Sequence, residues 1–135
     1  MRLKKPYILM LEDDPDDRMI TDSIASQLEV DIQFLYLTYS NELFSALESG
    51  EQPALIMLDY NSKPQNGLEI LKKLKSNPAY RSIPVIVLGE SASDPHIDEC
   101  YQLGANSFIL KPGTYDLTVH KIRTFLEYWF QVAEL

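Results

Sequence analysis

Three short apolar runs, each ended by charged residues, constrain the fold of this 135-residue chain most strongly. The runs are residues 7–11, 55–58 and 108–110, and the charges that end them are Glu12 with Asp13, Asp59, and Lys111, respectively. Such runs are typical of parallel strands buried on both faces, whose carboxyl ends meet at the edge where α/β proteins bind ligands. We therefore expect these charges to converge, and because gathered carboxylates repel one another, a divalent cation is implied.

Apolar runs and amphipathic segments alternate five times along the chain. Strands are expected at about residues 7–11, 32–38, 54–58, 85–88 and 107–110. Helices are expected at about residues 15–28, 40–50, 67–77, 96–103 and 115–133. This alternation predicts right-handed βαβ units and an α/β fold of the (βα)5 type, in which helices cover both faces of a five-stranded parallel sheet as a doubly wound, three-layer sandwich.

Local signals fix several helix ends. Asp14 is predicted as the N-cap of the first helix, with Pro15 at its first position. Met19 is expected on the apolar stripe of this helix, and Ser40 is expected to cap the second helix. Gly104 is predicted to stop the fourth helix.

Composition limits the functional classes. The net charge of −8 argues against a nucleic-acid surface, which needs lysine and arginine to neutralise phosphates. One cysteine, Cys100, excludes an internal disulfide, fits a reducing compartment and is expected as a small core residue. No signal peptide or membrane-spanning run is apparent. The expectation is one cytoplasmic domain over residues 1–135, with no membrane association and no output domain.

The order and spacing of the motifs resemble the receiver domain of two-component response regulators over nearly the whole chain. The segments that carry the resemblance are Glu12-Asp13-Asp14, Leu58-Asp59, Asn66-Gly67, residues 83–88, Gly104-Ala105 and Lys111-Pro112. The acidic start and the tryptophan-bearing last helix are similar to the small stand-alone regulators found beside phytochrome-type kinases. The resemblance implies a flavodoxin-like fold.

The resemblance also assigns roles. Asp59 is the implied phosphoacceptor, whose carboxylate forms an acyl phosphate. Mg²⁺ is implied as the cofactor, held by the side chains of Glu12, Asp13 and Asp59 and by the backbone carbonyl of Asn61. Lys111 would balance phosphate charge.

The same residues also have purely structural explanations. The acids after the first strand also suit helix capping and the helix dipole, which is the favoured reading for Asp14. Asp59 could be a polar residue at a strand end, and Lys111 a solvated lysine before a turn. The resemblance implies a cis peptide between Lys111 and Pro112.

The resemblance assigns a conformational switch to two positions, 89 and 108, and the first of them departs from the family pattern. Gly89 stands where receivers usually carry threonine or serine, so it lacks the hydroxyl that would contact the phosphoryl group and couple to the switch aromatic. Phe108 occupies that aromatic position. Glu90 follows Gly89 and could repel or crowd the phosphoryl group, and Ser91 could supply a hydroxyl. Pro64 is displaced from the usual position in the loop after Asp59.

Three functional hypotheses follow. In the first, a sensor histidine kinase or histidine phosphotransfer protein donates a phosphoryl group to Asp59. The domain then signals to an unidentified downstream protein through the face formed by the fourth helix, fifth strand and fifth helix. Self-association through this face is left open, and no small-molecule turnover is expected. In the second, Gly89 and Glu90 have disabled the switch and the domain acts by docking. The third, a hydrolase of the haloacid-dehalogenase type, is disfavoured because Asn61 stands where a second aspartate is needed.

The remaining candidates have ordinary structural explanations. His96 and His120 are expected at the surface. The aromatic band of Phe125, Tyr128, Trp129 and Phe130 is expected to be mostly core, with at least one ring facing outward as a candidate partner surface.

Overall fold

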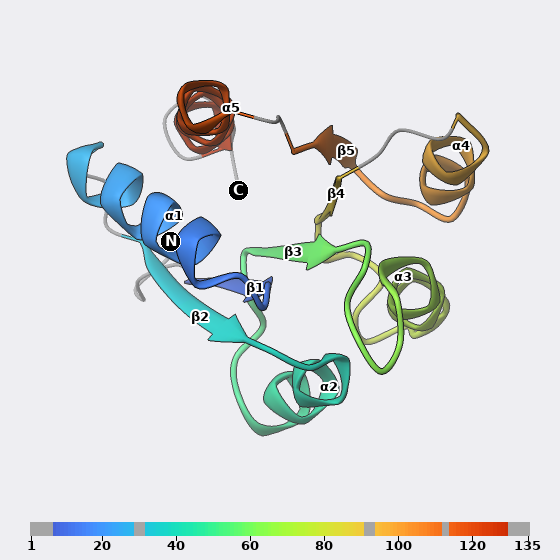
Figure 1. Cartoon of the computed structure of the whole chain (residues 1–135). Helices are drawn as coiled ribbons and strands as arrows, with labels where there is room; N and C mark the ends of the chain where they lie inside the picture. Colours follow the sequence, from blue (N-terminus) through green and yellow to red (C-terminus); the bar gives the residue numbers. More distant parts are fainter. Residues whose placement is uncertain (1–6, 29–31, 91–93, 112–113, 130–135) are drawn as a thin grey trace.

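The computed structural model describes residues 7–28, 32–90, 94–111 and 114–129, and five strands alternate with five helices in this part of the chain (Figure 1). The strands are β1 (Tyr7–Leu11), β2 (Gln33–Leu37), β3 (Leu55–Asp59), β4 (Val85–Gly89) and β5 (Ser107–Leu110). The helices are α1 (Pro15–Gln27), α2 (Ser40–Ser49), α3 (Gly67–Ser76), α4 (Asp94–Gln102) and α5 (Tyr115–Glu127).

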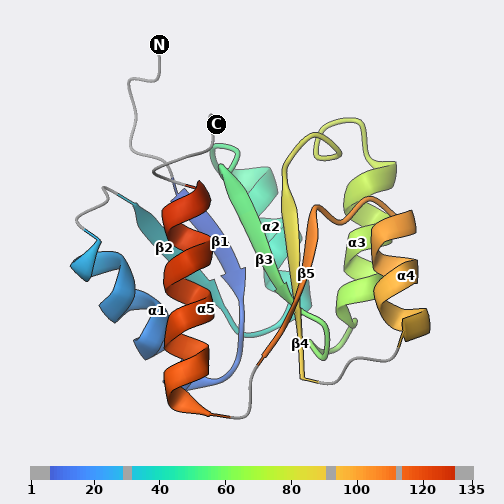
Figure 2. The ribbon, with the colours of Figure 1, turned by 90° about the horizontal axis from the view of Figure 1, so that it is seen from above.

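All neighbouring strands pair in parallel, in the order β2-β1-β3-β4-β5, and Figure 2 shows them running in one direction. The chain moves outward from β1 to β2 and then returns to β3 on the other side of β1. The sheet therefore has its topological switch point between β1 and β3, where ligands bind in folds of this kind. The predicted α/β, doubly wound, flavodoxin-like fold is confirmed.

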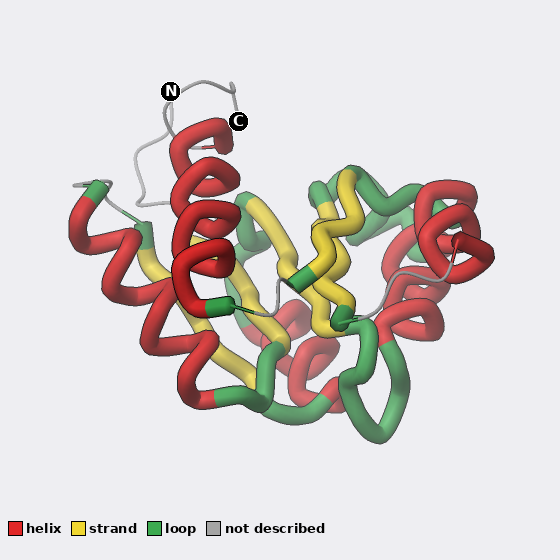
Figure 3. Tube along the Cα trace, turned by 45° about the horizontal axis from the view of Figure 1, so that its top comes forward, coloured by secondary structure: helices red, strands yellow, loops and turns green. Residues whose placement is uncertain are grey.

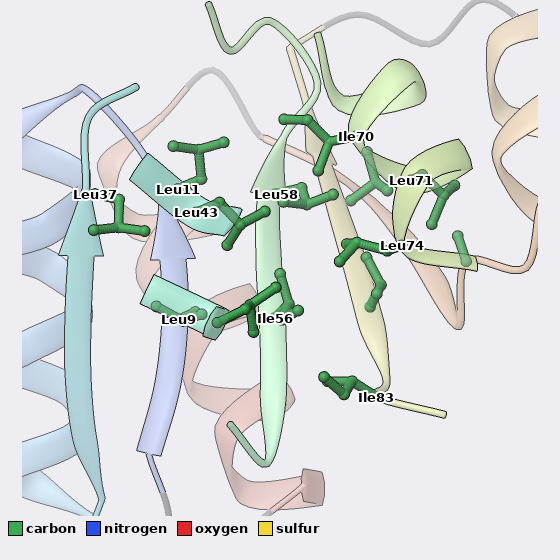
Figure 4. Packing of buried hydrophobic residues seen from close by; sticks show 14 of the residues in the cluster. Leu9, Leu11, Leu37, Leu43, Ile56, Leu58, Ile70, Leu71, Leu74 and Ile83 are labelled. Atoms are coloured by element: carbon green, nitrogen blue, oxygen red, sulfur yellow. The ribbon is translucent and has the colours of Figure 1, made fainter. Parts of the chain in front are cut away.

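Alternating side chains of the strands form two hydrophobic cores, one on each face of the sheet. Leu9 and Ile56 face α2 and α3 in one core, part of which is shown in Figure 4. Ile8 and Met57 face α1 and α5 in the other. Helices consequently flank the strands on both sides (Figure 3), which completes the predicted three layers.

The predicted start of α1 is confirmed, whereas two details nearby are wrong. Asp14 Oδ1 accepts a hydrogen bond from the Asp16 amide at 2.9 Å, so Asp14 caps the helix. Met19 is 68% exposed instead of lying in the apolar stripe. Ser40 is the first helical residue of α2 instead of its cap, and its buried Oγ accepts from the Gln65 amide at 2.9 Å.

Other boundaries differ by a few residues. Helix α4 begins at Asp94 instead of residue 96, and β4 extends to Gly89. Helix α5 ends at Glu127, and the predicted extension to residue 133 lies largely outside the described residues. Gly104 has a φ of 105°, which favours glycine and supports its predicted role in stopping α4. No described helix combines the length and apolar character required to cross a membrane.

Candidate functional site

The acids that end β1 and β3 meet at the topological switch point. Leu11 of β1 pairs with Leu58 of β3, so the residues that follow them emerge side by side. Carboxylate oxygens of Glu12, Asp13 and Asp59 all lie within 4.8 Å of one another. Glu12 and Asp59 are buried, whereas Asp13 is exposed. The structure therefore brings together the three side chains that were expected to converge.

Lys111 reaches the same cluster from the end of β5. Its Nζ donates a very short hydrogen bond to Glu12 Oε1 and lies 4.0 Å from Asp59 Oδ2. The ammonium also lies 3.2 Å from Asp17 Oδ2, on the first turn of α1. The Lys111 ammonium thus contacts three carboxylates, those of Glu12, Asp17 and Asp59, at the carboxyl edge of the sheet.

Burial and charge shift the pKa values of the central pair. Burial raises the pKa of the Glu12 carboxyl to about 7, against the opposing influence of Lys111. Burial alone would lower the pKa of Lys111, but the hydrogen bond to Glu12 and the charges of Glu12, Asp59 and Asp17 raise it above its ordinary value. Lys111 therefore stays charged, but its single positive charge does not balance the negative charge of the surrounding acids.

The loop after β3 orients Asp59. The Asn61 amide donates to Asp59 Oδ1 at 3.0 Å, and the Ser62 amide donates to the Asp59 carbonyl at 3.2 Å. Gly67, at the start of α3, donates its amide to the Tyr60 carbonyl at 2.8 Å. Its missing side chain is required there, because a Cβ would lie 2.8 Å from Tyr60 Cα. The loop and α3 together hold the carboxylate of Asp59 in place.

The three acids fit a divalent cation such as Mg²⁺. Ligands of Mg²⁺ lie at roughly 2.1 Å from the ion, so the oxygens of one shell are about 3–4 Å apart. Oxygens within 4.8 Å of one another reach this spacing with small side-chain adjustments. The carboxylates are hard donors of the kind that Mg²⁺ prefers. Use of the Asn61 carbonyl as a fourth ligand stays a prediction.

The two predicted switch positions are in direct contact. A Cβ placed on Gly89 would lie 2.5 Å from Cζ of Phe108 and 3.0 Å from its Cε1, so the ring occupies the space of a side chain at position 89. The Phe108 ring also packs against Tyr60, with ring centroids 6.3 Å apart. The Tyr101 hydroxyl accepts a hydrogen bond from the Phe108 amide at 3.0 Å. Gly89 therefore allows the inward position of this ring.

Replacing Gly89 with alanine should force Phe108 outward. Overpacking of this kind costs about 1–3 kcal/mol of the free energy of unfolding. In a Phe108→Ala background the same substitution should be neutral or slightly stabilising, because alanine suits a strand better than glycine. Urea unfolding of the four proteins of this cycle should give a coupling of about 1 kcal/mol or more. Equal effects of Gly89→Ala in both backgrounds would refute the contact.

Two charged residues of α1 belong to the site but were not predicted as part of it. Arg18 Nε donates to the Glu12 carbonyl at 2.5 Å, and its Nη2 donates to Thr38 Oγ1 at 3.1 Å. These bonds attach the loop after β1 to the end of β2. Asp17 is one of the acids after the first strand, for which the sequence indicated only a match to the helix dipole.

The other candidates are settled in part. His120 is exposed, as expected, whereas exposed His96 also stacks on Tyr60 with ring centroids 5.3 Å apart. Cys100 is buried as predicted, and among the described rings of the aromatic band Tyr128 faces outward, at 54% exposure. Glu90 is exposed. The Lys111-Pro112 peptide, Ser91 and Phe130 lie outside the described residues.

An acidic cluster beside a lysine, at the switch point of a parallel α/β sheet, defines a domain suited to binding a cation together with a phosphoryl group. Residues 8–123 match the family model of the response regulator receiver domain. The chain belongs to this family.

Relatives and solved structures agree with this assignment. The response regulator Rcp1 of Synechocystis sp. is 25% identical over 134 residues, covering 95% of this chain and 91% of Rcp1. ARR5 of Arabidopsis thaliana, a two-component response regulator, is 45% identical over 58 residues, but this match covers only 32% of ARR5. The phosphorylated cyanobacterial phytochrome response regulator RcpA superposes with a TM-score of 0.91 at 25% identity, covering 98% of this chain and 99% of RcpA. The Mn²⁺-bound form of Rcp1 has a TM-score of 0.91 at 24% identity, covering 96% of this chain and 98% of Rcp1.

Proposed function

We propose that this receiver domain accepts a phosphoryl group on Asp59 from a sensor histidine kinase or a histidine phosphotransfer protein, with Mg²⁺ bound by Glu12, Asp13, Asp59 and the Asn61 carbonyl. The observation that carries the proposal is the convergence of the acids with Lys111 at one edge of the sheet. Two relatives support it, since RcpA is known in a phosphorylated form and Rcp1 in a Mn²⁺-bound form.

Each side chain has a distinct task in this reaction. A carboxylate oxygen of Asp59 attacks phosphorus, the bond from phosphorus to the donor's imidazole nitrogen breaks, and the imidazole keeps the electron pair and takes a proton from water. The Asn61 amide keeps the Asp59 carboxylate oriented. Lys111 lies where its charge can offset that of the transferred group. The metal ion, when bound, supplies further neutralisation of the phosphoryl oxygens.

The output side of the proposal rests on the β5 edge of the sheet. Helix α4, strand β5 and helix α5 would form the face that meets a downstream protein, and Phe108 links this face to Gly89 beside the site. Self-association through the same face stays a prediction, as does the organisation of residues 1–135 as one receiver without an output domain. The alternative of a pure docking module finds no support in the comparisons, because RcpA, a relative with the same fold, is known in a phosphorylated form.

Acetyl phosphate provides the direct test. With Mg²⁺ present, intact-mass measurement should detect one phosphoryl group per chain, and peptide mapping should locate it at Asp59. A chelator should suppress the adduct, because Lys111 alone leaves the acids undercompensated. Absence of an adduct under conditions that label an ordinary receiver, or an adduct on another residue, would reject the proposal.

A further inference from the structure

Asp17 contacts the lysine of the site without belonging to the cation cluster of Glu12, Asp13 and Asp59. Its Oδ2 lies 3.2 Å from Lys111 Nζ, closer than Asp59 Oδ2 at 4.0 Å. Both partners are largely shielded, with side-chain exposures of 20% for Asp17 and 16% for Lys111. Shielding reduces solvent screening, so this ion pair is stronger than an ordinary surface pair.

The contact holds the ammonium on the side of the site that faces α1 and α5. A cavity of about 30 Å³ lies beside it on that side, and its lining includes Asp17, Lys111 and Thr118. Lys111 Nζ already lies nearer to Asp17 Oδ2 than to Asp59 Oδ2. Attraction toward Asp17 therefore opposes a closer approach of the ammonium to Asp59.

The attraction between Asp17 and Lys111 has its largest effect when a metal ion is bound. Glu12 would then direct its carboxylate toward the ion, which weakens its hold on Lys111. Asp17 is outside the group of oxygens that lie within 4.8 Å of one another, so it remains available to the lysine. A phosphoryl group on Asp59 must then compete with Asp17 for the same ammonium.

We propose that Asp17 is a positioning residue that retains Lys111 beside α1 and thereby lowers the affinity of the site for a phosphoryl group. This inference rests on the proposed function, because it concerns how the same site balances the charge of its ligand. It assigns to this acid a role in setting how readily the phosphorylated form is reached.

Beryllofluoride, a mimic of the phosphoryl group, measures this effect by calorimetry in the presence of Mg²⁺. Asp17→Asn should bind it about two- to fivefold more tightly than the wild type, the range expected for removing one partly shielded ion pair. The matched control is Asp16→Asn, which removes the same charge from an exposed position on the same helical turn. Asp17→Glu, which keeps the charge, should bind like the wild type, and Asp17→Ser should repeat the effect of the asparagine.

A second readout separates positioning from general electrostatics. Affinity for Mg²⁺ alone should not be higher in Asp17→Asn than in Asp16→Asn, because the released Lys111 still competes with the ion for the Glu12 carboxylate. Equal beryllofluoride affinities of the two asparagine variants, or weaker binding by Asp17→Asn, would overturn the inference while leaving Asp59 as the phosphoacceptor. Failure of the wild type both to bind beryllofluoride and to form an adduct on Asp59 would instead remove the proposed function.

Discussion

Asp59→Asn is expected to form no phosphoryl adduct with acetyl phosphate and Mg²⁺, and to be more stable than the wild type in a chelator. The first result follows because an amide oxygen is a poor nucleophile toward phosphorus. The second follows because Asp59 is only 7% exposed and lies among acids whose oxygens are within 4.8 Å. Removing one of these charges should relieve repulsion worth about 1 kcal/mol, even at nearly aqueous screening. Intact mass and thermal melting measure the two effects.

The control for this prediction is Asp13→Asn, which alters a proposed ligand and leaves the proposed acceptor. It should weaken Mg²⁺ binding and form the adduct only at higher Mg²⁺ concentration. Its gain in melting temperature in a chelator should be smaller, because Asp13 is exposed and its repulsion is already screened. Adding Mg²⁺ should stabilise the wild type more than either variant. An adduct on Asp59→Asn, or a lower melting temperature than the wild type in a chelator, would contradict this account.

Gly67→Ala is expected to reduce both stability and phosphorylation. The added Cβ would lie 2.8 Å from Tyr60 Cα and 3.1 Å from the Asp59 carbonyl oxygen. Both are backbone atoms, so no side-chain rotation relieves the contact and the Asp59–Tyr60 backbone must shift. We expect a loss of about 1–3 kcal/mol in the free energy of unfolding. Because small displacements of reacting groups are costly, the labelling rate should fall by about tenfold or more.

Gly50→Ala is the matched control for this substitution. Gly50 follows α2 with a φ of −142°, and a Cβ there would meet nothing closer than the Ala46 carbonyl at 3.7 Å. We expect urea unfolding and labelling rates close to those of the wild type. If Gly67→Ala behaved like Gly50→Ala in both measurements, the tight contact between α3 and the phosphoacceptor loop would be wrong.

The fold was predictable because its signals are local. Burial of β1, β3 and β4 on both faces required runs of apolar residues, and such runs can be recognised in the order of residues alone. Two predictions for individual side chains were wrong because tertiary contacts outweighed local preferences. Serine is a common helix cap, but the Ser40 side chain is buried and accepts a hydrogen bond from the Gln65 amide. Met19 has an apolar side chain, but the helix turns it to the surface.

The convergence of the site was also predictable, because parallel strands deliver their ends to one edge. Strand polarity alone therefore predicts that Glu12, Asp13, Asp59 and Lys111 lie together, as they do. Asp17 and Arg18 were missed, since helical spacing indicates which residues share a face but not which strand end a long side chain reaches. Their contacts with Lys111 and the Glu12 carbonyl depend on how α1 crosses the sheet.

The sequence by itself determined the parallel sheet, its two apolar cores and the set of charges at its carboxyl edge. Strand burial and strand polarity follow directly from the order of apolar and charged residues along the chain. Only the tertiary structure decided that Phe108 fills the space above Gly89 and that Lys111 is divided among three acids. These features depend on distances of a few ångströms between side chains far apart in the chain. Packing of whole helices and strands sets such distances, and no local pattern encodes them.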